Sequence, residues 1–459
     1  MLDVDVTSIH FGAFKSLYQV PCDLGHFTVI TGPNGAGKSN LVEGIHFLAE
    51  INEHGLEIAV SRAGGYENIA HRRARRAKRP VTVAVDVRLD ASDIARISRS
   101  IRPFDESESD SDNRLRADSS VTYHHSFSLR TATQALTADF RVSDEVITLR
   151  TDQDQDILDL RRGSDSRLLV TAPRRRSPPW LAELIFPFRE KSYVDLLSSR
   201  PQEKTSLISE SFHFGNALGY VTRALAQSRV FQLSPQECRR SGVPTPNATL
   251  DRYGSNLPAA ADYLRKRDSD AWERVQWAMK SIMPGLIDID VTFTEDRRLT
   301  LQFRERRVGK AWTTGEVSDG TIQALALFVA LYDERAPLLI IEEPENSIHP
   351  WILRQFLDLC RENEDKQIVL TTHSPVVLND VPAESVRIMW RRNGRSQLAR
   401  LVDLDPELVD AYMRGELTVF DAYDSGLISE GVPPGYSGDF DDDELEELDD
   451  EEVKGQEHL

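Results

Sequence analysis

Apolar residues along this chain follow patterns that predict both strands and a buried helix. Val81–Leu89 alternates apolar residues with others, as expected for a strand with one buried face. Leu338–Ile341 and Ile368–Leu370 are continuous apolar runs, which are typical of strands buried on both faces of a parallel sheet. Phe27–Ile30 predicts another short strand. Thr321–Tyr332 is apolar on nearly all sides and predicts a buried helix.

Further strands and helices are predicted around these elements. The expected strands are Val6–Phe14, Val121–Leu129, Phe140–Val142, Val146–Leu149, Leu168–Val170, Ile289–Phe293 and Leu299–Phe303. The pattern is helical from Pro178 to about Ala226, and again over Leu257–Lys266 and Ala271–Met283. The predicted fold class is therefore α/β, a mainly parallel sheet whose two halves are separated in sequence by an antiparallel β lobe and helices.

This organisation divides the chain into five segments. Residues 1–90 and 305–400 are expected to form the two halves of one α/β fold. Residues 91–304 would form a middle lobe in which a β meander precedes helices. Residues 401–437 are a C-terminal extension, and residues 438–459 are an acidic tail that we expect to be disordered.

The composition changes this picture little. With 40% hydrophobic and 28% charged residues, the chain is ordinary for a globular protein. We find no apolar run of the ~18 residues that a membrane span needs, and no signal-peptide pattern at the start. The three cysteines lie far apart, which favours neither a disulfide framework nor a zinc site. We therefore expect a reduced, cytoplasmic protein with no membrane association.

The net charge of −19 is unevenly distributed. From Asp439 onward the chain holds twelve acidic residues and one lysine, which is typical of a solvated tail. The alternative is a tail that imitates nucleic acid or masks a basic surface. An opposite, basic cluster consists of Arg72, Arg73, Arg75, Arg76, Lys78 and Arg79. It is either a solvated loop or a set of DNA contacts, and the sequence leaves both interpretations open.

A complete phosphate-binding loop follows the predicted strand at Phe27–Ile30. Its residues are Gly32, Pro33, Asn34, Gly35, Ala36, Gly37, Lys38 and Ser39, and an amphipathic helix follows directly. The glycines allow backbone N–H groups to turn towards a phosphate, and the helix N-terminus adds positive potential. We expect Lys38 to neutralise the β- and γ-phosphates and the Ser39 hydroxyl to bind Mg²⁺.

Two glutamates follow the apolar run Leu338–Ile341, in the manner of a Walker B strand. Glu342 suits the shell of a magnesium ion, which takes one or two carboxylates and keeps several waters. Glu343 is then placed to orient or deprotonate an attacking water. Taken alone, the pair is more typical of two solvated glutamates at a strand end. The phosphate loop upstream favours the functional interpretation.

Two further short motifs lie near this strand. Ser318, Asp319 and Gly320 precede the predicted buried helix, where a hydroxyl and bare N–H groups would form an anion site. Alone, they are also an ordinary turn and helix cap. His373 directly follows the strand Ile368–Leu370, where ligands gather in open α/β sheets. We expect it to donate a hydrogen bond to the γ-phosphate.

The order of these motifs resembles that of ABC-class ATPases. The residues within each motif resemble those of the RecF/SMC branch of that class. The chain is most similar to compact bacterial ATPases related to the overcoming-lysogenization-defect proteins. The similarity spans about residues 1–430. It is carried by Phe14–Ser16, Gly32–Asn40, Tyr253–Leu257, Ser318–Thr321, Glu342–Pro350 and Thr372–Pro375.

The resemblance implies an ATPase that uses Mg²⁺ and forms a homodimer or higher homo-oligomer. Two copies would bind head-to-tail around two ATP molecules, with the signature Ser318–Gly320 of one completing the phosphate loop of the other. It implies that Lys38, Glu343 and His373 are catalytic and that Lys15 and Asn40 contact the nucleotide. A communicating loop is implied at Glu345, Asn346, Ser347 and His349.

The chain departs from transporter ATPases in its signature and in carrying Glu342 where transporters have aspartate. A glutamine loop is not evident, and Gln232 is only a weak candidate for it. We find no acidic cluster of a fused nuclease domain, so we expect no nuclease activity in this chain.

Two functions stay open. The first is an ATP-driven clamp or switch in DNA repair or anti-phage defence, acting with a separate effector such as a nuclease or toxin. The second is an ATP-gated scaffold that sequesters and releases that effector without binding DNA directly.

Overall fold

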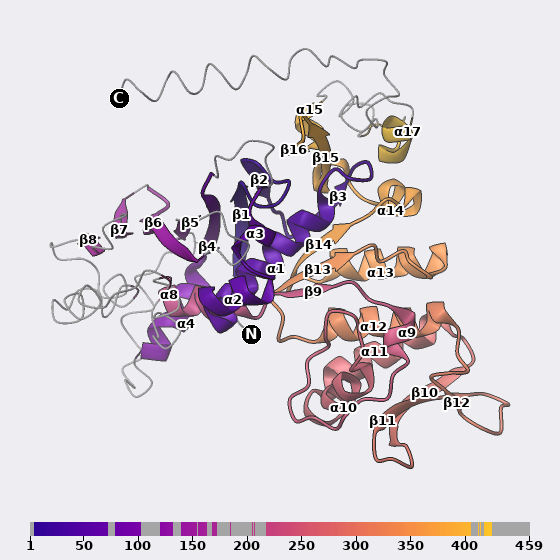
Figure 1. Cartoon of the computed structure of the whole chain (residues 1–459). Helices are drawn as coiled ribbons and strands as arrows, with labels where there is room; N and C mark the ends of the chain where they lie inside the picture. The colour runs from indigo at the N-terminus through magenta and orange to yellow at the C-terminus, as the bar shows by residue number, and fades with distance from the viewer. Residues whose placement is uncertain are drawn as a thin grey trace.

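The structure is a computed structural model of the chain, in which two large sheets enclose a central helix (Figure 1). It describes residues 4–71, 79–101, 120–131, 139–153, 155–162, 168–171, 184, 204, 206, 217–404, 412, 414 and 417–424. The acidic tail and the basic residues 72–78 lie outside these ranges.

The first sheet has six strands in the order β16-β15-β3-β14-β13-β9, and all neighbours from β15 to β9 are parallel. Its strands are β3 (Phe27–Thr31), β9 (Arg229–Phe231), β13 (Leu338–Glu342), β14 (Gln367–Thr371), β15 (Val386–Arg392) and β16 (Arg395–Arg400). β13 and β14 are buried along their whole length, as their continuous apolar runs predict.

Alternate residues of β13 enter two different cores. Leu338 and Ile340 pack into the core that contains α1 (Lys38–His54) and the second large sheet. Leu339 and Ile341 pack into the core on the other face. That core is formed with α10 (Leu257–Arg267), α11 (Ser269–Ile282), α12 (Asp319–Tyr332), α13 (Pro350–Glu362) and α14 (Pro375–Asp380). The side-chain period of two explains why this strand must be apolar at every position.

The second large sheet is antiparallel, with seven strands in the order β2-β1-β4-β5-β6-β7-β8. They are β1 (Asp5–Gly12), β2 (Val20–Asp23), β4 (Val81–Leu89), β5 (Val121–Thr131), β6 (Phe140–Thr151), β7 (Asp156–Arg162) and β8 (Leu168–Thr171). β4 buries every second side chain, as its alternation predicts. Together the two sheets confirm the predicted fold class, a parallel α/β sheet with an antiparallel β lobe.

The helix α1 lies between the two sheets, and one glycine allows its close approach. A Cβ added at Gly44 would lie 2.6 Å from the ring of Phe11 on β1, so a larger residue would push the helix away from the sheet. The neighbouring described helices are α2 (Leu56–Arg62), α3 (Tyr66–Ile69), α4 (Ala91–Ile101) and α8 (Ala217–Ala226).

Small elements complete the described part of the chain. A three-stranded sheet contains β10 (Leu286–Phe293), β11 (Leu299–Glu305) and β12 (Trp312–Thr313). The remaining short helices are α9 (Pro235–Cys238), η2 (Ala383–Ser385), α15 (Leu401–Leu404) and α17 (Val419–Asp424).

Some boundaries differ from the sequence prediction for physical reasons. The two strands expected at 140–142 and 146–149 are one strand, β6, with a register shift opposite Ser128/Leu129. The polar residues between them do not form a turn because Glu145 is buried and paired with His125 and Arg162. β9 lies inside the segment 91–304 yet pairs with β13, so the parallel sheet draws on the middle of the chain as well as on its two ends.

Candidate nucleotide-binding and hydrolysis site

The carboxyl ends of neighbouring parallel strands bring the predicted motifs to one edge of the sheet. β3 runs into the phosphate loop at Gly32, β13 ends at Glu342, and β14 is followed two residues later by His373. β9, on the other side of β13, ends directly before Gln232, whose side chain is exposed there. In open α/β sheets this edge is where ligands bind.

The backbone of the phosphate loop is formed as a phosphate cradle requires. Gly32 has φ +149°, and an added Cβ would overlap the backbone carbonyl of Met389 on β15, so only glycine fits. The helix α1 begins at Lys38 after Gly37, with no side chain capping its N–H groups. These donors are therefore available to an anion at the helix N-terminus. Asn34, Gly35 and Ser39 are exposed at the mouth of the loop.

Lys38 is held inside the loop by backbone carbonyls. Its Nζ donates to the oxygens of Gly32 (2.8 Å) and Pro33 (3.2 Å), and the residue is 8% exposed. Burial lowers the pKa of Lys38 to about 8, and the nearby carboxylates of Glu343 and Glu345 oppose that shift. The ammonium group is thus positioned at the strand edge and only partly solvated.

The two glutamates after β13 have different environments. Glu342 is 7% exposed, and its Oε2 lies 3.3 Å from Nη2 of Arg252. Glu343 has φ +47°, a conformation that is costly for a non-glycine residue and that recurs at functional sites. Its N–H donates to the carbonyl of Thr371 (2.9 Å), and its Oε2 accepts from Asn346 (3.0 Å). The strained backbone and these bonds fix Glu343 beyond the strand end.

Glu345 connects the loop after β13 to the residues after β14. Its Oε1 accepts hydrogen bonds from the Thr372 hydroxyl (2.7 Å) and from the N–H of His373 (3.0 Å). Burial is the main cause of the raised pKa of Glu345. The pKa of His373 is lowered, first by burial and second by the charge of Lys38, while Glu343 opposes the shift. The imidazole is therefore neutral at pH 7, with one N–H to donate.

Of the signature residues, Gly320 packs on the loop after β13, and Ser318 and Asp319 have other partners within the chain. The Ser318 hydroxyl caps α12 by accepting from the N–H of Thr321 (3.1 Å). A Cβ added at Gly320 would lie 2.8 Å from the backbone oxygen of Ser347, so the helix N-terminus packs closely on the loop. Asp319 pairs with Arg239 (2.6 Å). His349 caps α13, its Nδ1 accepting from Trp351 N–H (3.2 Å).

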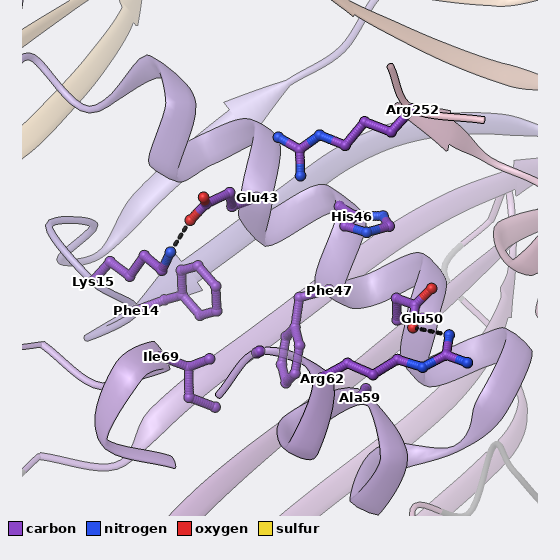
Figure 2. Close-up of a pocket in the computed structure, with 11 residues that line it drawn as sticks. Phe14, Lys15, Glu43, His46, Phe47, Glu50, Ala59, Arg62, Ile69 and Arg252 are labelled. Carbon is purple, nitrogen blue, oxygen red and sulfur yellow. Dashed lines mark hydrogen bonds and ion pairs between the residues drawn. The ribbon is translucent and has the colours of Figure 1, made fainter. Parts of the chain in front are cut away.

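A cavity of about 540 Å³ opens beside α1 (Figure 2). Apolar side chains that include Phe14 and Phe47 line it, together with charged residues of α1 and α2. Lys15 lies at its edge in an ion pair with Glu43. Next to Lys15, the Ser16 hydroxyl accepts from Asn40 of the phosphate-loop helix (2.7 Å). The Phe14–Ser16 segment is therefore tied to the phosphate loop.

Of the basic cluster, the structure describes Arg79 alone. Its guanidinium lies over the ring of Tyr18, 5.0 Å from the centroid, and Arg395 lies over the same ring at 4.0 Å. Arg79 therefore has a packing contact in this chain. Arg72, Arg73, Arg75, Arg76 and Lys78 lie outside the described residues, so their role as DNA contacts stays a prediction.

Sequence reasoning missed Arg252, which the fold brings to Glu342. A single arginine in a loop, ninety residues before its partner, carries no spacing signal. The only pointer was its position directly before the segment Tyr253–Leu257, which we associated with the family.

A comparison with protein families shows which family the chain belongs to. Residues 27–379 match the AAA domain family that is described as a putative AbiEii toxin of a type IV toxin–antitoxin system. The chain belongs to this family. The match covers more than half of the chain and includes the phosphate loop, both glutamates and His373.

Individual relatives are similar over smaller regions or at low identity. The DNA replication and repair protein RecF of Streptomyces avermitilis is 34% identical over 106 residues, which are 22% of this chain and 28% of that protein. Among solved structures, an Smc head bound to the C-winged helix domain of ScpA has a TM-score of 0.45 and 14% identity, covering 86% of this chain and 97% of that one. The Smc head domain of Thermotoga maritima has a TM-score of 0.37 and 11% identity, covering 86% and 98%. The relation to overcoming-lysogenization-defect ATPases stays a prediction.

Among the described residues, no helix is both long enough and apolar enough to cross a membrane.

Proposed function

We propose that this protein binds and hydrolyses ATP at the carboxyl edge of its parallel sheet. The observation that carries the proposal is the convergence of Lys38, Glu343 and His373 from the ends of three neighbouring strands. A phosphate loop, an acidic group for the attacking water and a neutral hydrogen-bond donor are the parts that phosphoryl transfer to water requires. Membership of the AAA domain family supports the same reaction.

Each residue has a role that follows from its environment. The Lys38 ammonium, which donates to two backbone carbonyls of the loop, would donate to the β- and γ-phosphate oxygens instead. Glu343, fixed by its backbone and by Asn346, would orient the water for attack on the γ-phosphate. His373 would donate to a γ-phosphate oxygen, because its ring is neutral and its backbone is held by Glu345. These groups act by position and charge, which is how catalysis of this reaction proceeds.

Magnesium fits the oxygen donors at this edge. Ser39 offers a hydroxyl in the first turn of α1, and Glu342 offers a carboxylate at the end of β13. Hydroxyl, carboxylate and water oxygens are the ligands this hard cation prefers. When bound, Mg²⁺ would neutralise phosphate charge. The protein's own contribution would be to hold these two oxygens at the carboxyl edge of the parallel sheet.

We further propose that two copies share each ATP, with the signature of one closing the site of the other. The N–H groups at the start of α12 that the Ser318 hydroxyl leaves uncapped would form an anion site of the kind that a γ-phosphate fills. Gly320 packs on Ser347, and Glu345 on the same loop bonds to His373. When a second copy contacts the signature of this chain, the contact would therefore shift the position of His373 in the same chain.

The ATPase proposal is tested by removing the charge of the phosphate loop. Lys38→Ala should reduce ATP binding at least tenfold and abolish hydrolysis, because the phosphates lose their buried ammonium partner. Arg274→Ala on α11, which removes an exposed ion pair with Glu334 and a contact with the Tyr332 ring, is the matched control and should change neither. Nucleotide binding by fluorescence and phosphate release measure the two effects. Unchanged turnover in Lys38→Ala contradicts the proposal.

The wider role that we propose is an ATP-driven switch in a DNA-linked process, acting with a separate effector protein. The name of the RecF relative and the toxin–antitoxin description of the family support this direction. The other candidate is an ATP-gated scaffold that sequesters a nuclease or toxin without touching DNA. A cytoplasmic location and the lack of nuclease activity in this chain stay predictions.

Salt dependence separates the two roles. A DNA clamp should bind duplex DNA with an affinity that falls steeply with salt, because basic side chains displace counterions from the phosphates. Changing Arg72, Arg73, Arg75 and Arg76 together to alanine should reduce that slope by as many as about four units. A protein with no salt-dependent DNA affinity favours the scaffold instead.

A further inference from the structure

One arginine clamps the segment that leads into the signature. Arg239 directly follows α9, and its Nη1 donates to the carbonyl of Thr314. Its Nη2 donates to the carbonyl of Val317 (2.8 Å) and to Oδ1 of Asp319 (2.6 Å). The Thr314 hydroxyl in turn donates to the carbonyl of Arg239 (3.2 Å). The guanidinium therefore holds the chain on both sides of Ser318.

The short helix before Arg239 is itself fixed against its neighbours. A Cβ added at Gly254 would overlap Sγ of Cys238, so the turn at Gly254 packs closely on α9. Gln323 of α12 is 1% exposed, and its Nε2 donates to the carbonyl of Leu233 just before α9 (3.4 Å). The segment around α9 is therefore joined to α12 by a buried glutamine as well as by Arg239. The guanidinium starts from a fixed base.

Asp319 brings a negative charge to the place where the signature would accept a phosphate. It is the first residue of α12, where an acidic side chain stabilises the helix itself. The same charge opposes a phosphate at the uncapped N–H groups, because like charges repel. The Asp319 side chain is 54% exposed, so solvent screens this repulsion only in part. Arg239 places the opposite charge beside the carboxylate, so the pair presents no net negative charge to a phosphate.

We propose that Arg239 is a positioning residue for the signature, which fixes its backbone and neutralises Asp319 so that the signature accepts the γ-phosphate held by a second copy. The inference rests on the proposed two-copy function and deepens it. A guanidinium suits both tasks, because its N–H donors form a planar fork that reaches a carboxylate and carbonyl oxygens together. Arg239 acts through Ser318–Gly320, so its removal leaves the phosphate loop of its own chain intact.

The test is the strength of ATP-dependent dimerisation in a background with little turnover. Arg239→Ala is added to Glu343→Gln, and sedimentation at saturating Mg²⁺ and ATP gives the dissociation constant of the dimer. This constant should rise about tenfold, while the ATP affinity of dilute protein stays within about twofold. Arg239→Lys keeps the charge without the planar fork and should lie between the two. Arg240→Ala, which removes an exposed ion pair with Glu237 (2.9 Å), is the matched control and should change neither.

A second substitution separates charge from backbone clamping. Asp319→Asn removes the charge that Arg239 neutralises, so adding it to Arg239→Ala should restore dimerisation to within about threefold of the Glu343→Gln parent. A purely structural arginine predicts no recovery, because the carbonyls of Thr314 and Val317 stay unheld. No recovery, or an Arg239→Ala variant that dimerises as its parent does, overturns the inference alone. A Glu343→Gln parent that binds ATP and stays a single chain overturns the two-copy proposal as well.

Discussion

Lys38 shows how the environment of one residue sets the conditions for function. Its pKa is lowered to about 8 because it is buried, so in the free protein it is charged below this pH and increasingly neutral above it. Bound phosphates favour the charged form. ATP binding above about pH 8 therefore requires uptake of a proton, and below that pH it does not.

The pH dependence of ATP affinity follows from this sign. We expect affinity to be flat from about pH 7 to 8 and then to fall by up to about tenfold per pH unit, as measured by calorimetry. Lys38→Arg is the informative control, because a guanidinium stays charged throughout this range. Its affinity should be independent of pH there, whatever its absolute value. An equally steep fall in Lys38→Arg attributes the dependence to another group and contradicts this explanation.

At the residue scale, the sequence predicted which side chains would gather at one edge of the sheet but not how they are held. The motif spacing pointed to Lys38, Glu342, Glu343 and His373, and these lie at or just beyond the ends of β3, β13 and β14. The left-handed backbone of Glu343 and the contact of Arg252 with Glu342 depend on the folded chain. No local pattern encodes either of them.

At the element scale, the loop after β13 couples the parts of the site. Glu345 on this loop bonds to Thr372 and His373, and Ser347 on the same loop packs on Gly320 at the start of α12. The signature and the histidine are therefore joined through one short loop.

Substitutions at Glu345 test this coupling. Glu345→Ala removes the acceptor of both hydrogen bonds, so we expect kcat to fall about tenfold with little change in KM. Glu345→Gln keeps a carbonyl oxygen that can accept from the same two donors and should stay within about twofold of wild type. Thr372→Val removes one of the two bonds and should lie between them. If kcat falls equally in Glu345→Gln and Glu345→Ala in steady-state kinetics, the coupling role of Glu345 is refuted.

The strands that form the site were predictable to different degrees. β13 and β14 were found because strands buried on both faces must be continuously apolar. β9 has only three residues, too few for a pattern, and its place beside β13 is decided by long-range pairing. β6 was divided in two because the polar run Ser143–Glu145 has the appearance of a turn in the sequence, whereas Glu145 is buried and paired.

At the scale of the whole molecule, α1 and the parallel sheet form a rigid support for an exposed edge. The phosphate loop opens at that edge, and the N-terminus of the signature helix α12 packs on the loop after β13. That a second copy completes the site is implied by the family resemblance and not by any pattern of burial. It is the central claim of our account.

Glu343→Gln tests that claim most directly. This variant should bind ATP but activate water poorly, so the shared site should stay closed. Light scattering after size exclusion, with saturating Mg²⁺ and ATP, should give about twice the 51.8 kDa of one chain. The double variant Lys38→Ala/Glu343→Gln should elute as it does without nucleotide. A Glu343→Gln protein that binds ATP and still elutes at the mass of one chain contradicts the account.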